Sequence, residues 1–109
     1  MNIDYKKLLI KKINDKDIKL GIIGLGYVGL PLALTFAEKR FKVLGIDIDK
    51  DKVKTINNGS SYLKHIDSKR IKKSYEKKLL IPTSNLEIIS KVDVIIICLP
   101  TPLNKFREP

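Results

Sequence analysis

Hydrophobic residues recur along this 109-residue chain as short unbroken runs, separated by longer amphipathic stretches. The runs at 19–23, 42–46 and 92–99 consist mainly of Ile, Leu and Val, which is typical of parallel strands buried on both faces. A shorter run at 79–81 predicts another strand, which we expect Pro82 to end. Strands that alternate with helical stretches indicate an α/β fold.

Between these runs the hydrophobic positions follow a helical period. In the helix expected at 27–39, Leu30, Ala33, Leu34 and Ala37 stand at i, i+3, i+4 and i+7, and should face the sheet. Further helices are predicted at 5–14, after a cap at Asp49 or Asp51, at 67–78, and after a cap at Ser84. Right-handed crossovers through these helices give the strand order 3-2-1-4.

Three glycines stand between the first strand and the next helix with the spacing G-x-G-x-x-G. Gly24 permits a tight turn, Gly26 lets the backbone approach a pyrophosphate, and Gly29 allows the helix to pack closely on the strand. The pyrophosphate would face free N–H groups at the positive end of that helix. A structural turn that binds nothing is the alternative, but the strand and helix around the glycines favour a dinucleotide site.

Asp47 ends the second strand, 18 residues after Gly29. A carboxylate at this position can accept hydrogen bonds from the adenosine ribose and would repel a 2′-phosphate, so we expect NAD rather than NADP. A complete domain of this kind needs about six strands, whereas four are predicted here. We therefore expect an incomplete doubly wound Rossmann-type sheet. Residues 18–109 would be the N-terminal part of an NAD-binding domain, preceded by an amphipathic arm at 1–17 that could pack on the domain or on a partner subunit.

The formal net charge of +10 raises the possibility of a nucleic-acid partner. We favour a solvated helix face and expect no nucleic acid, because aromatic residues are not interleaved with the charges. The basic residues concerned are Lys64, Lys69, Arg70, Lys72, Lys73, Lys77 and Lys78.

The single cysteine, Cys98, lies in the fourth apolar run, where we expect a buried structural thiol rather than a nucleophile. The lone His65 fits no triad or metal pattern and receives no role. We expect no metal. No segment reaches the length of a membrane span, so we expect no membrane contact and a cytoplasmic protein.

Several separated motifs together produce a family resemblance over residues 18–109. The chain resembles the UDP-glucose/GDP-mannose dehydrogenase family, because it carries motifs of that family in the same order along the sequence. These motifs are the segment 23–33, Asp47, the Asn58-Gly59 and Ser61-Tyr62 pairs, Asp93, and Pro100-Thr101-Pro102. The Gly-Leu-Pro-Leu-Ala variant at 29–33 most resembles the branch acting on UDP-N-acetylhexosamines.

This resemblance implies oxidation of the C6 alcohol of a UDP-sugar to the carboxylate with two NAD, and a homo-oligomer at full length. It places cofactor contacts on Val28, Asp47, Lys52 and Thr101, although Lys52 could equally be an exposed helix lysine. The residues expected to bind the cofactor are Gly24, Gly26, Tyr27, Val28, Gly29, Asp47, Lys52, Pro100 and Thr101.

The resemblance also places the catalytic cysteine and the sugar-binding residues beyond position 109, so we expect this chain alone to be inactive. Two other classes stay open at this point. One is the NAD-binding half of a different dehydrogenase, such as a 3-hydroxyacid enzyme, and the other is a non-catalytic nucleotide-binding module.

Overall fold

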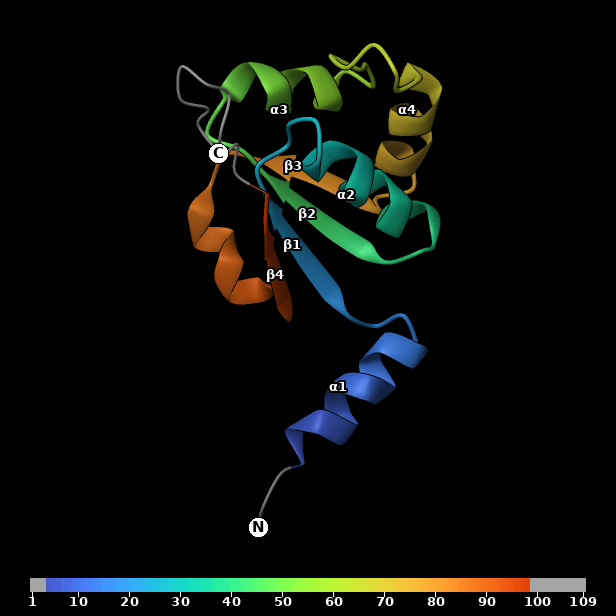
Figure 1. Ribbon diagram of the computed structural model, residues 1–109, viewed down its shortest axis with the longest axis vertical. Helices are drawn as coiled ribbons and strands as arrows, with labels where there is room; N and C mark the ends of the chain where they lie inside the picture. The colour runs from blue at the N-terminus through green and yellow to red at the C-terminus, as the bar shows by residue number, and fades with distance from the viewer. Residues whose placement is uncertain (1–3, 99–109) are drawn as a thin grey trace, which may run out of the picture.

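The computed structural model describes residues 4–98, and a parallel sheet lies at their centre (Figure 1). Its strands are β1 (Lys19–Ile23), β2 (Lys42–Ile46), β3 (Leu80–Thr83) and β4 (Val94–Ile97). They pair in the order β3-β2-β1-β4. The predicted order and the bounds of the two central strands are confirmed.

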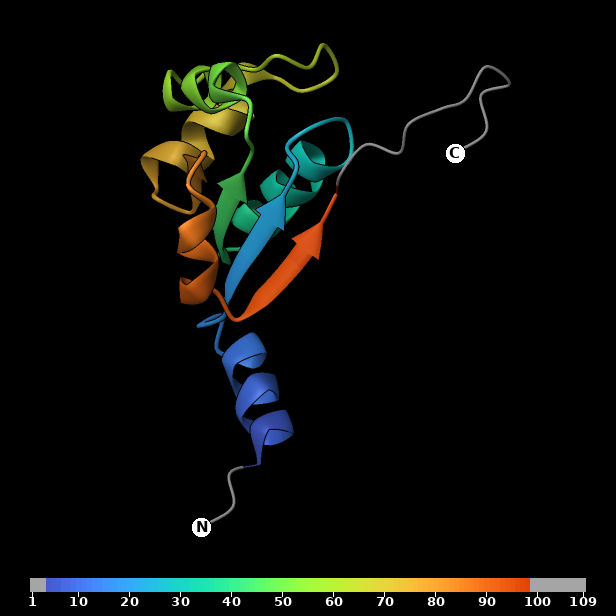
Figure 2. The ribbon, with the colours of Figure 1, turned by 90° about the vertical axis from the view of Figure 1, so that its left-hand side faces the viewer.

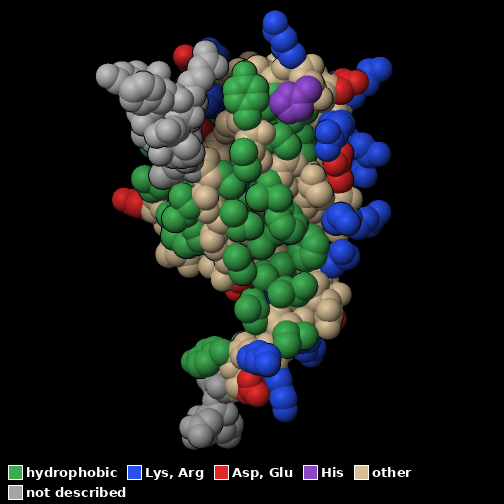
Figure 3. Space-filling model, in the orientation of Figure 1, with side chains coloured by type: hydrophobic (Ala, Val, Ile, Leu, Met, Phe, Trp, Pro, Cys, Tyr) green, Lys and Arg blue, Asp and Glu red, His purple; other side chains and the backbone are tan. Residues whose placement is uncertain are grey.

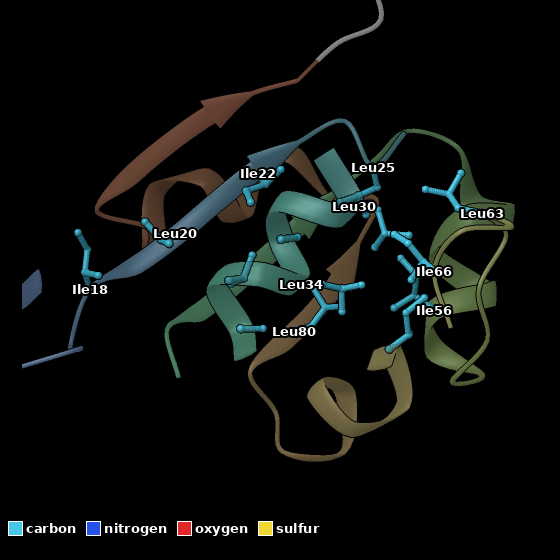
Figure 4. Packing of buried hydrophobic residues seen from close by; sticks show 14 residues of the cluster. Ile18, Leu20, Ile22, Leu25, Leu30, Leu34, Ile56, Leu63, Ile66 and Leu80 are labelled. Carbon is cyan, nitrogen blue, oxygen red and sulfur yellow. The ribbon is translucent and has the colours of Figure 1, made fainter. Parts of the chain in front are cut away.

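Three α-helices pack together on one side of the sheet. They are α2 (Gly29–Glu38), α3 (Lys50–Asn57) and α4 (Ser68–Glu76). Helix α2 contacts β1, β2 and β3, whereas α3 and α4 contact β3 and one another. The 3-10 helix η1 (Leu86–Lys91) lies on the opposite face, as its position across the sheet from α2 shows in Figures 1 and 4. The chain moves from β1 to β2 to β3 in one direction across the sheet, and from β3 to β4 in the other. Because each crossover is right-handed, this change of direction places η1 on the opposite face from α2, α3 and α4.

The core lies between α2 and the sheet, and it extends to α3, α4 and the loop between these two helices (Figure 4). Leu30, Ala33, Leu34 and Ala37 are fully buried, which confirms the predicted face of this helix. Helix α2 begins at Gly29 rather than at Tyr27, because the intervening residues still belong to the glycine turn.

Strand β3 differs from its predicted span, since it includes Pro82 instead of ending there. Pro82 pairs with Gly45, and the Asp47 N–H donates to the Thr83 carbonyl beyond it. A proline has no N–H to donate, but an edge strand needs only the groups on its inner side. The position of β3 at the edge of the sheet therefore explains why proline is tolerated.

Strand β4 is shorter than the predicted 92–99, and Leu99 lies outside the described residues. Strand β4 pairs with β1. The Asp93 N–H donates to the Lys19 carbonyl just before β4, and the Cys98 N–H donates to the Ile23 carbonyl just after β4.

The prediction of Ser84 as a cap is also wrong. The Asn85 side chain caps η1 by accepting a 3.0 Å hydrogen bond from the Glu87 N–H.

Helix α1 (Tyr5–Asn14) has its predicted bounds and projects from the start of β1 away from the sheet (Figure 2). None of its described side chains is buried. Lys12 ties the helix to the sheet through an ion pair of 3.0 Å with Asp93. Among residues 4–98, no helix is long and apolar enough to cross a bilayer.

Asp93 holds three segments together at the base of the sheet. One carboxylate oxygen accepts from the Lys19 N–H at 2.9 Å, and the other accepts from the Lys12 ammonium. The backbone hydrogen bond and the Lys12 charge together hold the pKa of Asp93 below its ordinary value. The stabilisation is present above the unfolded-state pKa and is lost as the pH falls through the folded one.

We expect Asp93→Asn to lower the free energy of unfolding by about 1 kcal/mol at neutral pH. The deficit should stay constant down to about pH 5 and shrink as the pH falls through about 4 towards the lowered pKa of folded Asp93, because wild-type Asp93 then also loses its charge. Thermal unfolding of both proteins across this range measures the effect. A deficit that does not change with pH would contradict the assignment.

Candidate dinucleotide-binding site

A crevice of about 590 Å³ opens at the carboxyl ends of β1, β2 and β4. The chain reverses its direction of travel through the sheet at this point, which is where doubly wound sheets bind ligands. The crevice has apolar walls with a few polar groups, as small-molecule sites commonly have. Residues expected from the sequence to bind the cofactor line it together, namely Gly24, Gly26, Tyr27, Val28, Asp47 and Lys52.

The glycine turn after β1 forms the floor of the crevice. Gly24 has a φ of 95°, a conformation that favours glycine, and its N–H donates to the Ile46 carbonyl at 2.7 Å. A Cβ at Gly29 would lie 1.6 Å from the Gly24 carbonyl oxygen, so the close packing of α2 on the turn depends on this glycine. At Gly26 a Cβ would meet no atom of the described residues within 4 Å, which leaves the backbone open to the crevice.

The N-terminus of α2 points into this site without a cap. Within the described residues, Val28 makes no side-chain capping bond and no acidic side chain stands in the first turn. The Leu30 N–H already donates to the Gly26 carbonyl at 3.1 Å and Pro31 has no N–H, so the Gly29 N–H is the group that the first turn offers at the positive end of the helix dipole. An anionic group such as a pyrophosphate suits this position.

Asp47 lies beside the turn with its carboxylate largely enclosed. One oxygen accepts from the Leu25 N–H at 2.8 Å and the other from the Asp49 N–H at 2.9 Å. The Lys52 ammonium lies 3.9 Å from the same carboxylate. Each carboxylate oxygen has a second lone pair, so Asp47 can accept from ribose hydroxyls as well. The N–H groups of the turn and the acceptor oxygens of Asp47 therefore fit a dinucleotide.

Three exposed apolar side chains complete the crevice and were not expected from the sequence. Ile48 follows Asp47 directly, Leu86 begins η1, and Ile97 ends β4. Their position at or shortly after the carboxyl end of a strand is the signal that could have identified them, because such residues gather at the carboxyl edge of a parallel sheet. Of the three other expected residues, Gly29 packs against the turn without lining the crevice, and Pro100 and Thr101 lie outside the described residues.

Cys98 is not buried inside the fourth strand, contrary to the sequence expectation. It follows β4, is only half-buried, and lines the crevice. Its Cβ would lie 3.3 Å from a Cβ at Gly29, so it packs against the start of α2. The thiol is more accessible than predicted because β4 is an edge strand within the described part of the chain.

Four residues of the predicted basic cluster lie on α4, namely Lys69, Arg70, Lys72 and Lys73, and the other three flank this helix in sequence. Basic side chains gather on the right-hand side of Figure 3. Arg70 forms a two-pronged ion pair with Glu38, with distances of 2.7 and 2.9 Å, and this contact lowers the pKa of the Glu38 carboxyl. Lys72 lies 4.0 Å from Glu76 one turn later. Part of the basic face is therefore paired with acidic side chains of the same domain.

Comparisons with known proteins agree with this fold. The sequence profile of the UDP-glucose/GDP-mannose dehydrogenase family, NAD binding domain, matches residues 18–109. UDP-N-acetyl-D-glucosamine 6-dehydrogenase of Pseudomonas aeruginosa is 36% identical over 94 residues, which cover 86% of this chain and 21% of that protein. Protein CapL of Staphylococcus aureus is 38% identical over 90 residues, which cover 83% of this chain and 20% of that protein.

Solved structures show the same similarity. UDP-D-ManNAc dehydrogenase from Pyrococcus horikoshii superposes with a TM-score of 0.74 at 34% identity, covering 80% of this chain and 21% of that one. GDP-mannose dehydrogenase from Pseudomonas aeruginosa superposes with a TM-score of 0.75 at 27% identity, covering 82% of this chain and 21% of that one. The chain thus spans about a fifth of the length of the relatives that it matches.

Proposed function

The chain belongs to the UDP-glucose/GDP-mannose dehydrogenase family, whose NAD-binding domain it matches, and we propose that it is the NAD-binding part of a nucleotide-sugar 6-dehydrogenase. NAD is accordingly its cofactor. The substrate that we propose for the enzyme is a UDP-N-acetylhexosamine, because relatives named for such sugars are 36% and 34% identical to this chain. The proposed reaction oxidises the sugar C6 alcohol to the carboxylate and consumes two NAD.

The observation that carries this proposal is the juxtaposition of the open Gly26 backbone, the uncapped start of α2 and the Asp47 carboxylate at one crevice. When bound, NAD supplies the hydride acceptor. The chain's own residues would bind and orient it: the N–H groups of the turn and of Gly29 at the start of α2 would hold the pyrophosphate, and Asp47 would hold the adenosine ribose. Lys52 lies close enough to Asp47 to flank the same ribose.

We expect the chain to bind NAD at least about tenfold more tightly than NADP. A 2′-phosphate beside the enclosed Asp47 carboxylate would bring like charges together, which costs free energy. Titration with both cofactors by calorimetry measures the ratio. Equal or tighter binding of NADP would refute the role of Asp47.

Asp47→Asn should weaken NAD binding by about 1–3 kcal/mol and narrow the preference over NADP. The same change also disturbs the hydrogen bonds to Leu25 and Asp49, so the ratio of the two affinities is the decisive readout. Damage to the turn alone would weaken both cofactors alike and leave their ratio unchanged.

The 109-residue chain alone should produce no NADH from UDP-glucose, UDP-N-acetylglucosamine or UDP-N-acetylmannosamine. Hydride transfer needs the nicotinamide and the sugar C6 held in near-attack geometry, and we propose that the sugar-binding part of the enzyme supplies this positioning. Absorbance of NADH during prolonged incubation is the measurement. Turnover that Cys98→Ser abolishes would instead place the active site within this chain.

A further inference from the structure

The loop at residues 60–66, between α3 and α4, contacts the glycine turn at two points that cofactor binding by itself does not explain. The Tyr62 hydroxyl donates a hydrogen bond to the Leu25 carbonyl. The His65 ring stacks on Tyr27, with the ring centres 6.2 Å apart and the planes within 7° of parallel. Both partners, Leu25 and Tyr27, flank Gly26.

This loop is well anchored, so it can hold the turn in place. The Ser61 N–H donates to the Ser68 hydroxyl at 2.9 Å, and the Ser61 hydroxyl bonds to both the N–H and the carbonyl of Leu63. Leu63 and Ile66 are buried in the core. The position of Tyr62 is thus determined by the core rather than by the turn that it contacts.

The Leu25 carbonyl and the Gly26 N–H belong to one peptide group. In a planar trans peptide these two groups point in opposite directions, so fixing the carbonyl also fixes the N–H. A peptide next to glycine would otherwise be free to rotate, because glycine has no Cβ to restrict it. The Leu25 N–H is held as well, by Asp47, so side chains from two distant segments secure both polar backbone groups of this residue.

The surroundings of Tyr62 keep its hydroxyl a donor. Burial, together with the nearby charges of Asp47 and Asp49, raises the pKa of Tyr62, so the hydroxyl retains its proton. The Lys52 ammonium lies 5.8 Å above the centre of the tyrosine ring. Tyr62, Lys52 and Asp47 therefore form one connected group around Leu25.

We propose that Tyr62 is a positioning residue for the cofactor: it locks the Leu25–Gly26 peptide so that the Gly26 N–H is presented to the pyrophosphate. The inference rests on the proposed NAD binding and assigns a role to a residue that does not line the crevice. The ligand class concerned is a nucleoside diphosphate, because only the diphosphate would meet this N–H group.

Tyr62→Phe tests the proposal, since it removes the hydroxyl and keeps the ring. We expect NAD and ADP to bind about three- to tenfold more weakly, as for one lost hydrogen bond, whereas the affinity for adenosine should be unchanged. Amide NMR titrations of the chain with each ligand provide the affinities. Tyr75→Phe, in α4 and away from the crevice, is the matched control and should bind all three ligands like the wild type.

The spectra without ligand give a second measurement. In Tyr62→Phe the Gly26 amide signal should move or broaden, with the core signals unchanged, whereas Tyr75→Phe should leave Gly26 as it is. Unchanged NAD affinity in Tyr62→Phe would overturn this inference and leave the proposed function standing. Equal losses for NAD and adenosine, or collapse of the whole spectrum, would show a merely structural role. Failure of the wild-type chain to bind NAD would overturn both.

Discussion

Gly29→Ala is expected to unfold the chain or to lower its free energy of unfolding by about 3 kcal/mol or more. The added Cβ would lie 1.6 Å from the Gly24 carbonyl oxygen and 2.8 Å from its carbonyl carbon. Both are backbone atoms, so no side-chain rotation can relieve the clash. Helix α2 would have to move away from the turn, and its buried residues Leu30 and Leu34 would move with it.

Thermal unfolding followed by circular dichroism measures this effect, with Gly45→Ala as the matched control. A Cβ at Gly45 would lie 3.1 Å from two terminal carbons of the Leu25 side chain. A side chain can adjust where a carbonyl cannot, so the control should lose much less stability. If both variants melted near the wild-type temperature, the predicted close packing of α2 on the turn would be wrong.

Gly26→Ala should have the opposite outcome, with wild-type stability and NAD binding weakened at least about tenfold. The new methyl group would meet no atom of residues 4–98 within 4 Å, and the backbone of Gly26 is outside the left-handed region. No contact within the described part of the chain therefore opposes alanine. The methyl group would instead occupy the space in which the pyrophosphate should approach the turn most closely.

Melting curves and NAD titrations of the same two preparations separate these effects. Gly29→Ala should lower the melting temperature, whereas Gly26→Ala should keep the wild-type melting temperature and lose affinity for NAD. Full NAD affinity in Gly26→Ala would show that the cofactor does not approach the turn as proposed. Loss of stability in Gly26→Ala would show that the open space beside it is occupied in solution.

Local patterns determined much of this fold. The bounds of β1 and β2 follow from unbroken apolar runs, because central parallel strands are covered on both faces. The inner face of α2 follows from the helical period of Leu30 and Leu34. The strand order follows from the handedness of crossovers, which restricts the possible topologies. Each of these depends on residues close in sequence or on a general rule.

The ends of the outer elements were decided by their neighbours. Strand β4 is regular only where β1 runs beside it, so its apolar sequence overestimates its length. Pro82 is compatible with β3 because that strand lies at an edge. The half-exposure of Cys98 has the same origin, since an edge strand leaves its outer side uncovered. No local pattern carries this information.

The sequence by itself identified the glycine turn and Asp47 as parts of the crevice, because the glycine spacing and the place of Asp47 at a strand end are local features. Only the tertiary structure decided how they are held. Asp47 reaches Leu25 across 22 positions, and Tyr62 reaches it across 37. Such contacts depend on the path of β2, α3 and the following loop through space, and that path is set by the packing of the whole core.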